Sequence, residues 1–184
     1  MFSYRHAFHA GNHADVLKHA TLIAILNHML EKDAALMVVD THAGAGLYRL
    51  DGDYAETSGE SVEGYKKLVQ SQNSAKNSVK KESRAGVSIA LTATKNIAAI
   101  VNKTNKSEKI AKVALAPLLQ NYLDIVAEFN KTGSHRVYPG SPFIMAHLLR
   151  DHDKLKLFEL HPTDSRTLID NIAQQKKKKK IAVL

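Results

Sequence analysis

The spacing of apolar residues divides the first part of the chain into a helix, a strand and a loop. Apolar side chains recur at helical intervals over 13–31, which predicts one amphipathic helix. Asn12 precedes this helix as a candidate N-cap, and Asp15 follows three residues later in a capping-box-like arrangement. A short apolar run then predicts a buried strand at about 35–40, and a glycine-rich loop continues from it to Gly46.

The next strand pattern comes much later, at 155–160. In an open α/β sheet the second strand follows the first loop after ~20 residues, so the sequence predicts an insertion between the two strands. The segment 138–142 ends this insertion, because Tyr-Pro-Gly-Ser-Pro predicts a turn with Ser141 as the N-cap of a helix and Pro142 at its first position. A second crossover helix is expected to begin after His161.

These elements predict an α/β fold in two parts. Residues 1–46 and 139–184 form the first three strands of a parallel sheet with their crossover helices, and the apolar run 181–184 is the third strand. Residues 47–138 form an inserted, mainly helical subdomain, whose clearest predicted helix starts at Pro117.

Positive charge is concentrated in the predicted insertion. The chain has 26 Lys and Arg against 18 Asp and Glu, a net charge of +8. Between Lys66 and Lys112 there are eleven basic residues and only Glu82 and Glu108, a local charge of +9. Such a stretch is typical of contact with nucleic acid, because each neutralised phosphate releases counterions; a solvated lysine-rich surface is the alternative. Composition leaves open whether 70–107 forms two helices or an arm.

The remaining composition limits the class of protein. No run approaches the ~20 consecutive apolar residues of a membrane span, and the N-terminus lacks the core of a signal peptide, so we expect a soluble, cytoplasmic protein with no membrane partner. The chain has no cysteine, which excludes disulfides, Cys-ligated zinc and a cysteine nucleophile. His6, His9 and His13 are not spaced as one helical face and lack a completing ligand, so no metal is expected.

The strongest chemical signal follows the first predicted strand, where residues 40–46 read Asp-Thr-His-Ala-Gly-Ala-Gly. A strand that leads into a glycine-rich loop typically holds a nucleotide-like cofactor, although such turns also occur for packing. Arg49 replaces the third glycine of the dinucleotide fingerprint, which disfavours a nicotinamide oxidoreductase. The pattern is typical of S-adenosylmethionine sites instead. Glu159, expected at the end of the second strand, would accept hydrogen bonds from ribose hydroxyls unless it merely faces solvent.

The N-terminal segment 4–19 combines four histidines with Arg5, Lys18 and aromatic residues. This mixture suits contact with phosphates and stacked bases of RNA, because it supplies both positive charge and aromatic faces. Packing of the segment across the sheet is the alternative.

Together these motifs resemble the bacterial 23S ribosomal RNA adenine-N(6) methyltransferases of the RlmJ type. The resemblance is carried, in chain order, by Tyr4-Arg5-His6, Phe8-His9-Ala10-Gly11-Asn12, Ala14-Asp15-Val16-Leu17-Lys18-His19, Asp40-Thr41-His42-Ala43-Gly44-Ala45-Gly46, Tyr138-Pro139-Gly140-Ser141-Pro142 and Glu159-Leu160-His161-Pro162. It implies a Rossmann-like S-adenosylmethionine-dependent methyltransferase sheet with an inserted helical subdomain. It also implies transfer of a methyl group from S-adenosyl-L-methionine to the exocyclic amine of an adenine in 23S ribosomal RNA, without a metal.

The resemblance also assigns roles to individual residues. Cofactor contacts are implied for His19, His42, Ser141 and Glu159, with Asp40, Gly44 and Gly46 shaping the loop around the cofactor. A contact with the substrate RNA is implied for Tyr4, and Arg5 and Lys18 are expected to contact the RNA as basic residues of the segment 4–19. The full-length protein is expected to be monomeric.

The sequence departs from the family pattern in its insertion and in its catalytic motif. The insertion is longer and more basic than is usual in the family. The catalytic Asp-Pro-Pro-Tyr motif, which the family carries on its fourth strand, occurs nowhere in the 184 residues. The Asp-Gly expected after the third strand is also missing. We therefore expect this chain to be the N-terminal part of such an enzyme, without a catalytic residue, inactive by itself and prone to oligomerise. A non-catalytic RNA-binding fragment of that fold is the alternative.

Overall fold

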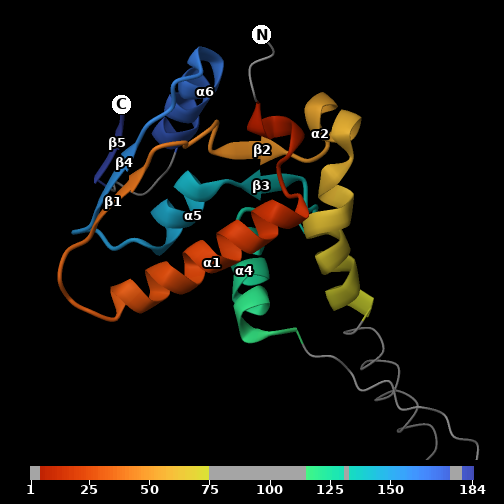
Figure 1. Cartoon of the computed structure of the whole chain (residues 1–184), viewed down its shortest axis with the longest axis horizontal. Helices are drawn as coiled ribbons and strands as arrows, with labels where there is room; N and C mark the ends of the chain where they lie inside the picture. The colour runs from red at the N-terminus through yellow and green to blue at the C-terminus, as the bar shows by residue number, and fades with distance from the viewer. Residues whose placement is uncertain (1–4, 75–114, 131–132, 175–179) are drawn as a thin grey trace, which may run out of the picture. The chain divides into compact units, whose positions relative to one another are not determined.

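The computed structural model describes residues 5–74, 115–130, 133–174 and 180–184 (Figure 1). The chain divides into two compact units, of which one comprises Met1–Lys67 with Ala116–Leu184 and the other Leu68–Leu115. The second unit lies within the predicted insertion and almost entirely outside the described residues, as do most of the basic stretch and Tyr4. The extent of the insertion, 47–138, therefore stays a prediction, and the strands and the site belong to the first unit.

Three parallel strands form the main sheet of a mixed α/β fold, as the sequence predicted. They are β1 (Met37–Asp40), β4 (Lys154–Leu157) and β5 (Lys180–Val183), in the order β1-β4-β5. Asp40 is in register with Leu157, and Leu157 with Val183, so all three strands end at the same edge. The sequence predicted Glu159 at the end of the second strand. This was wrong, because β4 ends at Leu157 and Glu159 lies in the loop that follows.

Three helices pack on one face of this sheet: α1 (His13–Leu30), α5 (Ser141–Leu148) and α6 (Pro162–Ala173) (Figure 1). Leu155 and Leu157 of β4 share one buried core with apolar residues of all three helices, which include Leu26, Met145 and Leu168. Side chains alternate between the two faces of a strand. Met37 and Val39 of β1 consequently lie on the other face, where they are 57% and 49% exposed.

The predicted N-cap is confirmed for α1 but not for α5. Asn12 caps α1 as expected, since its side chain accepts a hydrogen bond from the Asp15 backbone N–H at 2.9 Å. The predicted N-cap of α5 was wrong: Gly140 is the N-cap, and Ser141 is the first helical residue. The Ser141 hydroxyl donates a 2.6 Å hydrogen bond to Asp40 Oδ2 and is therefore not available to cap its own helix.

The chain leaves and re-enters the main sheet through two short strands that the sequence did not predict, β2 (Leu47–Arg49) and β3 (Val137–Pro139). They pair antiparallel, and the Gly140 N–H donates to the Gly46 carbonyl at 2.8 Å. Strands of three residues are too short to show an alternating pattern. Their pairing brings the loop after β1 next to the start of α5.

Further helices of the described residues lie before or within the predicted insertion. They include η1 (His6–Phe8), α2 (Asp53–Ser58), η2 (Val62–Lys66) and α4 (Pro117–Glu128). The predicted helix from Pro117 is thus confirmed as α4, which buries Tyr122 and Val126. Leu118, in the first turn of α4, is 39% exposed.

Candidate functional site

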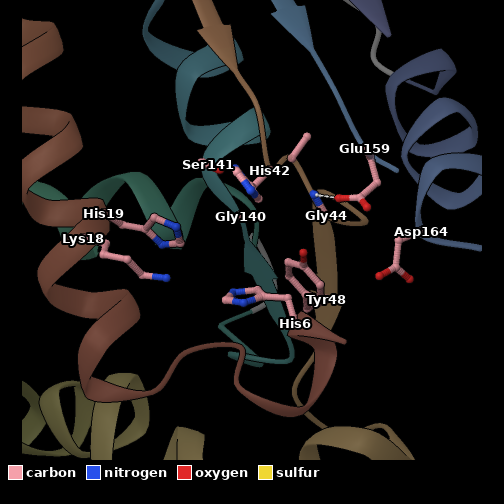
Figure 2. Close-up of a pocket in the computed structure, with 11 residues that line it drawn as sticks. His6, Lys18, His19, His42, Gly44, Tyr48, Gly140, Ser141, Glu159 and Asp164 are labelled. Carbon is pink, nitrogen blue, oxygen red and sulfur yellow. Dashed lines mark hydrogen bonds between the residues drawn. The ribbon is translucent and has the colours of Figure 1, made fainter. Parts of the chain in front are cut away.

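A cavity of about 250 Å³ opens where β1 and β4 end (Figure 2). The loops after these strands form one side of it, and α1, the first residue of α5, β2 and α6 contribute the other walls. Its lining residues are His6, Lys18, His19, His42, Ala43, Gly44, Tyr48, Gly140, Ser141, Glu159 and Asp164. In parallel α/β sheets this edge is where ligands bind.

Glu159 joins the loops that follow β1 and β4. Its Oε2 accepts a 2.7 Å hydrogen bond from the Gly44 backbone N–H, drawn in Figure 2, and its Oε1 accepts one of 2.7 Å from the His161 N–H. The carboxylate is therefore held at the cavity wall rather than pointing freely into solvent. Each oxygen keeps a further lone pair, so Glu159 can still accept hydrogen bonds from a ligand.

The two glycines of the loop have different roles. Gly44 lines the cavity with φ +60°, and a Cβ at this position would collide with the Tyr48 hydroxyl. Gly46, with φ +78°, lies behind the wall, where a Cβ would meet Leu168 and Phe143 side-chain atoms at 2.8 Å. Gly44 thus leaves room for the Tyr48 hydroxyl at the cavity wall, whereas Gly46 allows close packing of the loop on α5 and α6.

Asp40 supports the cavity from behind. Its Oδ1 accepts a 3.0 Å hydrogen bond from the His42 N–H, and its Oδ2 accepts the hydrogen bond from Ser141. Both contacts hold residues that line the cavity, so the carboxylate fixes the loop after β1 against the start of α5.

Asp15 organises the side of the cavity formed by α1 and the N-terminal segment. Its buried carboxylate lies 2.9 Å from His6 Nε2 and 2.9 Å from Lys18 Nζ, and it accepts a 3.0 Å hydrogen bond from the Gly11 N–H. Burial alone would raise the pKa of Asp15, but His6, His19 and Lys18 together lower it well below the usual value. The ionised Asp15 therefore holds two cavity side chains, His6 and Lys18, in place.

His19 is neutral at physiological pH although it lies one helical turn from Asp15. Its ring is only 5% exposed, and this burial lowers its pKa to about 4, with Asp15 partly opposing the shift. His19 Nδ1 lies 2.9 Å from the hydroxyl of Tyr138 in β3. The site thus combines a neutral histidine with the cationic Lys18.

A second cavity, of about 420 Å³, adjoins the first, and the two share Tyr48 and Asp164 as lining residues. Arg5 lies in this second cavity, where its guanidinium carbon is 5.4 Å from the centre of the Tyr54 ring. Arg5 also donates a 2.8 Å hydrogen bond to the Tyr54 hydroxyl. A cation beside an aromatic ring can contact both a phosphate and a base.

Most residues singled out in the sequence gather at these cavities. His19, His42, Gly44, Ser141, Glu159 and Lys18 line the first, Arg5 lines the second, and Asp40 and Gly46 support the wall. Sequence reasoning did not place His6, Tyr48, Gly140 or Asp164 at this site. His6 and Gly140 belong to motifs that it used, and Asp164 follows the last motif by two residues, whereas Tyr48 depends on the unpredicted strand β2.

Among the residues that the structure describes, no group of three or more His, Cys, Asp or Glu residues is arranged to hold a metal ion. None of the helices in this part of the chain has both the length and the apolar character that a membrane crossing requires.

Fold and cavity define an α/β protein with a polar ligand site at the ends of its parallel strands. Comparison with known proteins identifies the family. The family model described as "Ribosomal RNA large subunit methyltransferase D, RlmJ" matches residues 33–81 and 101–183. The chain therefore belongs to this methyltransferase family, whose members act in ribosomal RNA processing, and the resemblance inferred from the sequence is confirmed.

Individual relatives agree with the family. The chain is 38% identical over 164 residues to the ribosomal RNA large subunit methyltransferase J of Escherichia coli, a match that covers 89% of this chain and 44% of the relative. It is 34% identical over 177 residues to the protein of the same name from Haemophilus influenzae, with coverages of 96% and 48%. The crystal structure of protein LPL1258 from Legionella pneumophila matches with a TM-score of 0.65 and 26% identity, covering 95% of this chain and 48% of that one. The chain thus spans about half the length of the curated relatives it matches.

Proposed function

We propose that this chain carries the cofactor site of a ribosomal RNA methyltransferase that moves a methyl group from S-adenosyl-L-methionine to the exocyclic amine of an adenine in 23S ribosomal RNA. The observation that supports this most is the convergence of His19, His42, Gly44, Ser141 and Glu159 on one cavity. These residues come from four separate parts of the chain, and the sequence motifs indicate each of them.

The sheet is proposed to be part of a Rossmann-like methyltransferase domain. Its parallel strand order, β1-β4-β5, and the crossover helices α5 and α6 support this assignment. The similarity to the structure of LPL1258 supports it as well.

The chemical groups around the cavity fit S-adenosylmethionine. Glu159 has acceptor capacity left for the two ribose hydroxyls, and the neutral His19 and the Ser141 hydroxyl can meet the polar amino-acid part. When bound, this cofactor supplies the methyl group that the amine nitrogen takes from its sulfonium sulfur. The residues of this chain orient it: Glu159 fixes the ribose, and Gly44 lets the backbone approach closely.

The substrate RNA is proposed to approach from the side of Lys18 and Arg5. Lys18 remains 61% exposed at the side chain although it pairs with Asp15, so it can also meet a phosphate. Arg5 with Tyr54 lines the adjoining cavity, and Tyr4, which lies outside the described residues, is proposed to contact the RNA beside it. The local charge of +9 between Lys66 and Lys112 favours a polyanionic partner. We infer a cytoplasmic protein that needs no metal and is monomeric at full length.

Calorimetric titration of the chain with S-adenosylmethionine tests the cofactor site. We expect binding, and we expect Glu159→Gln to weaken it roughly 10- to 100-fold, because a charged acceptor for ribose hydroxyls is removed. Glu63→Gln is the matched control, since Glu63 is 71% exposed at the side chain and pairs only with Lys67 among the described residues. Absence of cofactor binding to the wild-type chain would contradict the proposal.

The RNA part is tested separately, by filter binding of protein-free ribosomal RNA at increasing salt. The proposal requires RNA binding that weakens with salt and is reduced by Arg5→Gln. RNA binding without any cofactor binding would instead favour the alternative, a non-catalytic RNA-binding fragment.

A further inference from the structure

Two buried tyrosines connect the cavity histidine to the inserted part of the chain. Tyr138 of β3 and Tyr122 of α4 are both 0% exposed. The Tyr138 hydroxyl lies 2.9 Å from His19 Nδ1 and 3.0 Å from the Tyr122 hydroxyl. Within the described residues, neither hydroxyl and neither ring nitrogen of His19 has another hydrogen-bond partner. The three groups form a short chain with two contacts.

Counting hydrogens decides which nitrogen of His19 carries its proton. If Nδ1 were protonated, three hydrogens, those of Nδ1, Tyr138 and Tyr122, would compete for two contacts, and one would be left buried without an acceptor. If Nε2 is protonated, Tyr122 donates to Tyr138 and Tyr138 donates to Nδ1, so both contacts are satisfied. The third hydrogen, on Nε2, is then on the side of the ring away from Tyr138, at the cavity that His19 lines, where water or a ligand can accept it. Burying an unpaired donor is unfavourable, so the second arrangement is preferred.

Because His19 is neutral, only one of its two ring nitrogens carries a hydrogen. Burial lowers its pKa to about 4, so at neutral pH the ring carries a single N–H. Nδ1 faces Tyr138, which leaves Nε2 as the nitrogen for the cavity that His19 lines (Figure 2). The tautomer therefore determines whether the cavity meets a hydrogen-bond donor or an acceptor.

We propose that Tyr138 is a positioning residue that holds neutral His19 in the Nε2–H form, so that the ring presents a donor to the ligand. The ligand atom opposite must then be an acceptor. In the amino-acid part of S-adenosylmethionine the carboxylate accepts hydrogen bonds and the ammonium does not, so His19 selects the carboxylate. Only this last step rests on the proposed function; the tautomer itself does not.

The tautomer can be measured without any ligand. Long-range ¹H–¹⁵N spectra of the chain at neutral pH should show His19 as the Nε2–H form, assigned by comparison with His19→Gln. Tyr138→Phe removes the donor to Nδ1, and we expect the signals to move towards a mixture of tautomers. Tyr122→Phe is the matched control, because it removes an equally buried hydroxyl that does not contact His19, and it should leave the Nε2–H form in place. An Nδ1–H form in the wild-type chain would overturn the proposal, even if Tyr138→Phe fails to fold.

Ligand affinity tests the selection of the carboxylate. Tyr138→Phe should weaken S-adenosylmethionine about tenfold, and it should leave 5′-methylthioadenosine, which lacks the carboxylate and the ammonium, within about twofold. Equal weakening of both ligands would show a general structural effect and contradict the proposal. If neither ligand binds the wild-type chain, the proposed function is contradicted. The tautomer of His19 is tested independently by the ¹H–¹⁵N spectra, which need no ligand.

Discussion

Asp15 and His19 lie one helical turn apart on the buried side of α1, yet their surroundings favour the ionised form of Asp15 and the neutral form of His19. Asp15 is surrounded by His6, Lys18 and a backbone N–H, which together outweigh the cost of burying a carboxylate. His19 instead contacts the hydroxyl of Tyr138, which does not compensate a positive charge. The same helix therefore offers a fixed anion and a neutral ring within reach of one cavity.

The low pKa of His19 predicts that the fold loses stability in mild acid. The value of about 4 in the folded state lies below 6.5, so the unfolded chain binds more protons between these two pH values. Stability should therefore fall as pH drops through this window, by roughly 3 kcal/mol at its acid end. Urea denaturation between pH 7.5 and pH 4.5 measures this, and His19→Gln should have a shallower dependence in that range. Equal slopes in the two proteins would contradict the assignment.

Gly46 and Gly59 allow a matched test of packing behind the cavity. Both have positive φ, +78° and +65°, so Ala is strained at either position, by about 1 kcal/mol. Only at Gly46 would the new Cβ also meet Leu168 and Phe143, whereas nothing lies within 4 Å at Gly59. We expect Gly46→Ala to lower the free energy of unfolding by roughly 2–4 kcal/mol and Gly59→Ala by about 1 kcal/mol. Similar losses at both positions would show that close packing at Gly46 is not needed.

At the scale of elements, the N-terminus of α1 connects the cavity wall to the segment before it. Asn12 accepts the hydrogen bond from Asp15 N–H and donates one of 2.9 Å to Glu60, so it fixes both the start of α1 and the residues after α2. Asn12→Ala should lower the free energy of unfolding by about 1–2 kcal/mol, and Asn12→Ser, which keeps a capping oxygen, by less. Thermal unfolding followed by circular dichroism distinguishes the two. Equal losses would mean that the cap contributes little.

The elements predicted from the sequence are those with a repeated pattern. Helix α1 and strands β1, β4 and β5 combine apolar periodicity with caps and turns that can be read locally. Strands β2 and β3 were missed because three residues carry no period, and each is stabilised by a partner that lies far away in the sequence. The N-cap prediction at Ser141 was wrong for a related reason: its hydroxyl bonds to Asp40, a contact that only the tertiary structure creates.

The residues of the candidate site also divide into those that local sequence patterns predict and those that only tertiary contacts bring to the site. Residues in the loops after parallel strands, such as Gly44 and Glu159, could be predicted because the sheet brings strand ends together. Tyr48 could not, since it reaches the cavity only through the pairing of β2 with β3. The contact between His19 and Tyr138 spans 119 positions in the sequence and depends on that pairing too.

At the scale of the whole molecule, the described residues cover one face of the sheet and leave apolar side chains exposed on the other. The three helices pack against Val38, Leu155 and Leu157, whereas Met37 and Val39 point away from that core. Among the described residues, β1 pairs with β4 alone, so its other edge has no partner strand. An exposed strand edge next to exposed apolar side chains favours association with another chain.

We therefore predict that the chain self-associates in a concentration-dependent manner. Sedimentation velocity over a range of protein concentrations should show a weight-average mass that rises above 20.3 kDa. Val39→Lys should shift the distribution towards monomer, because it places a charge on the face with exposed apolar side chains, beside the β1 edge. Ile25→Lys is the control, since Ile25 on α1 is 52% exposed, close to the 49% of Val39, but lies away from this face. A wild-type chain that stays monomeric at all concentrations, or an equal effect of both variants, would show that this face of the sheet does not drive association.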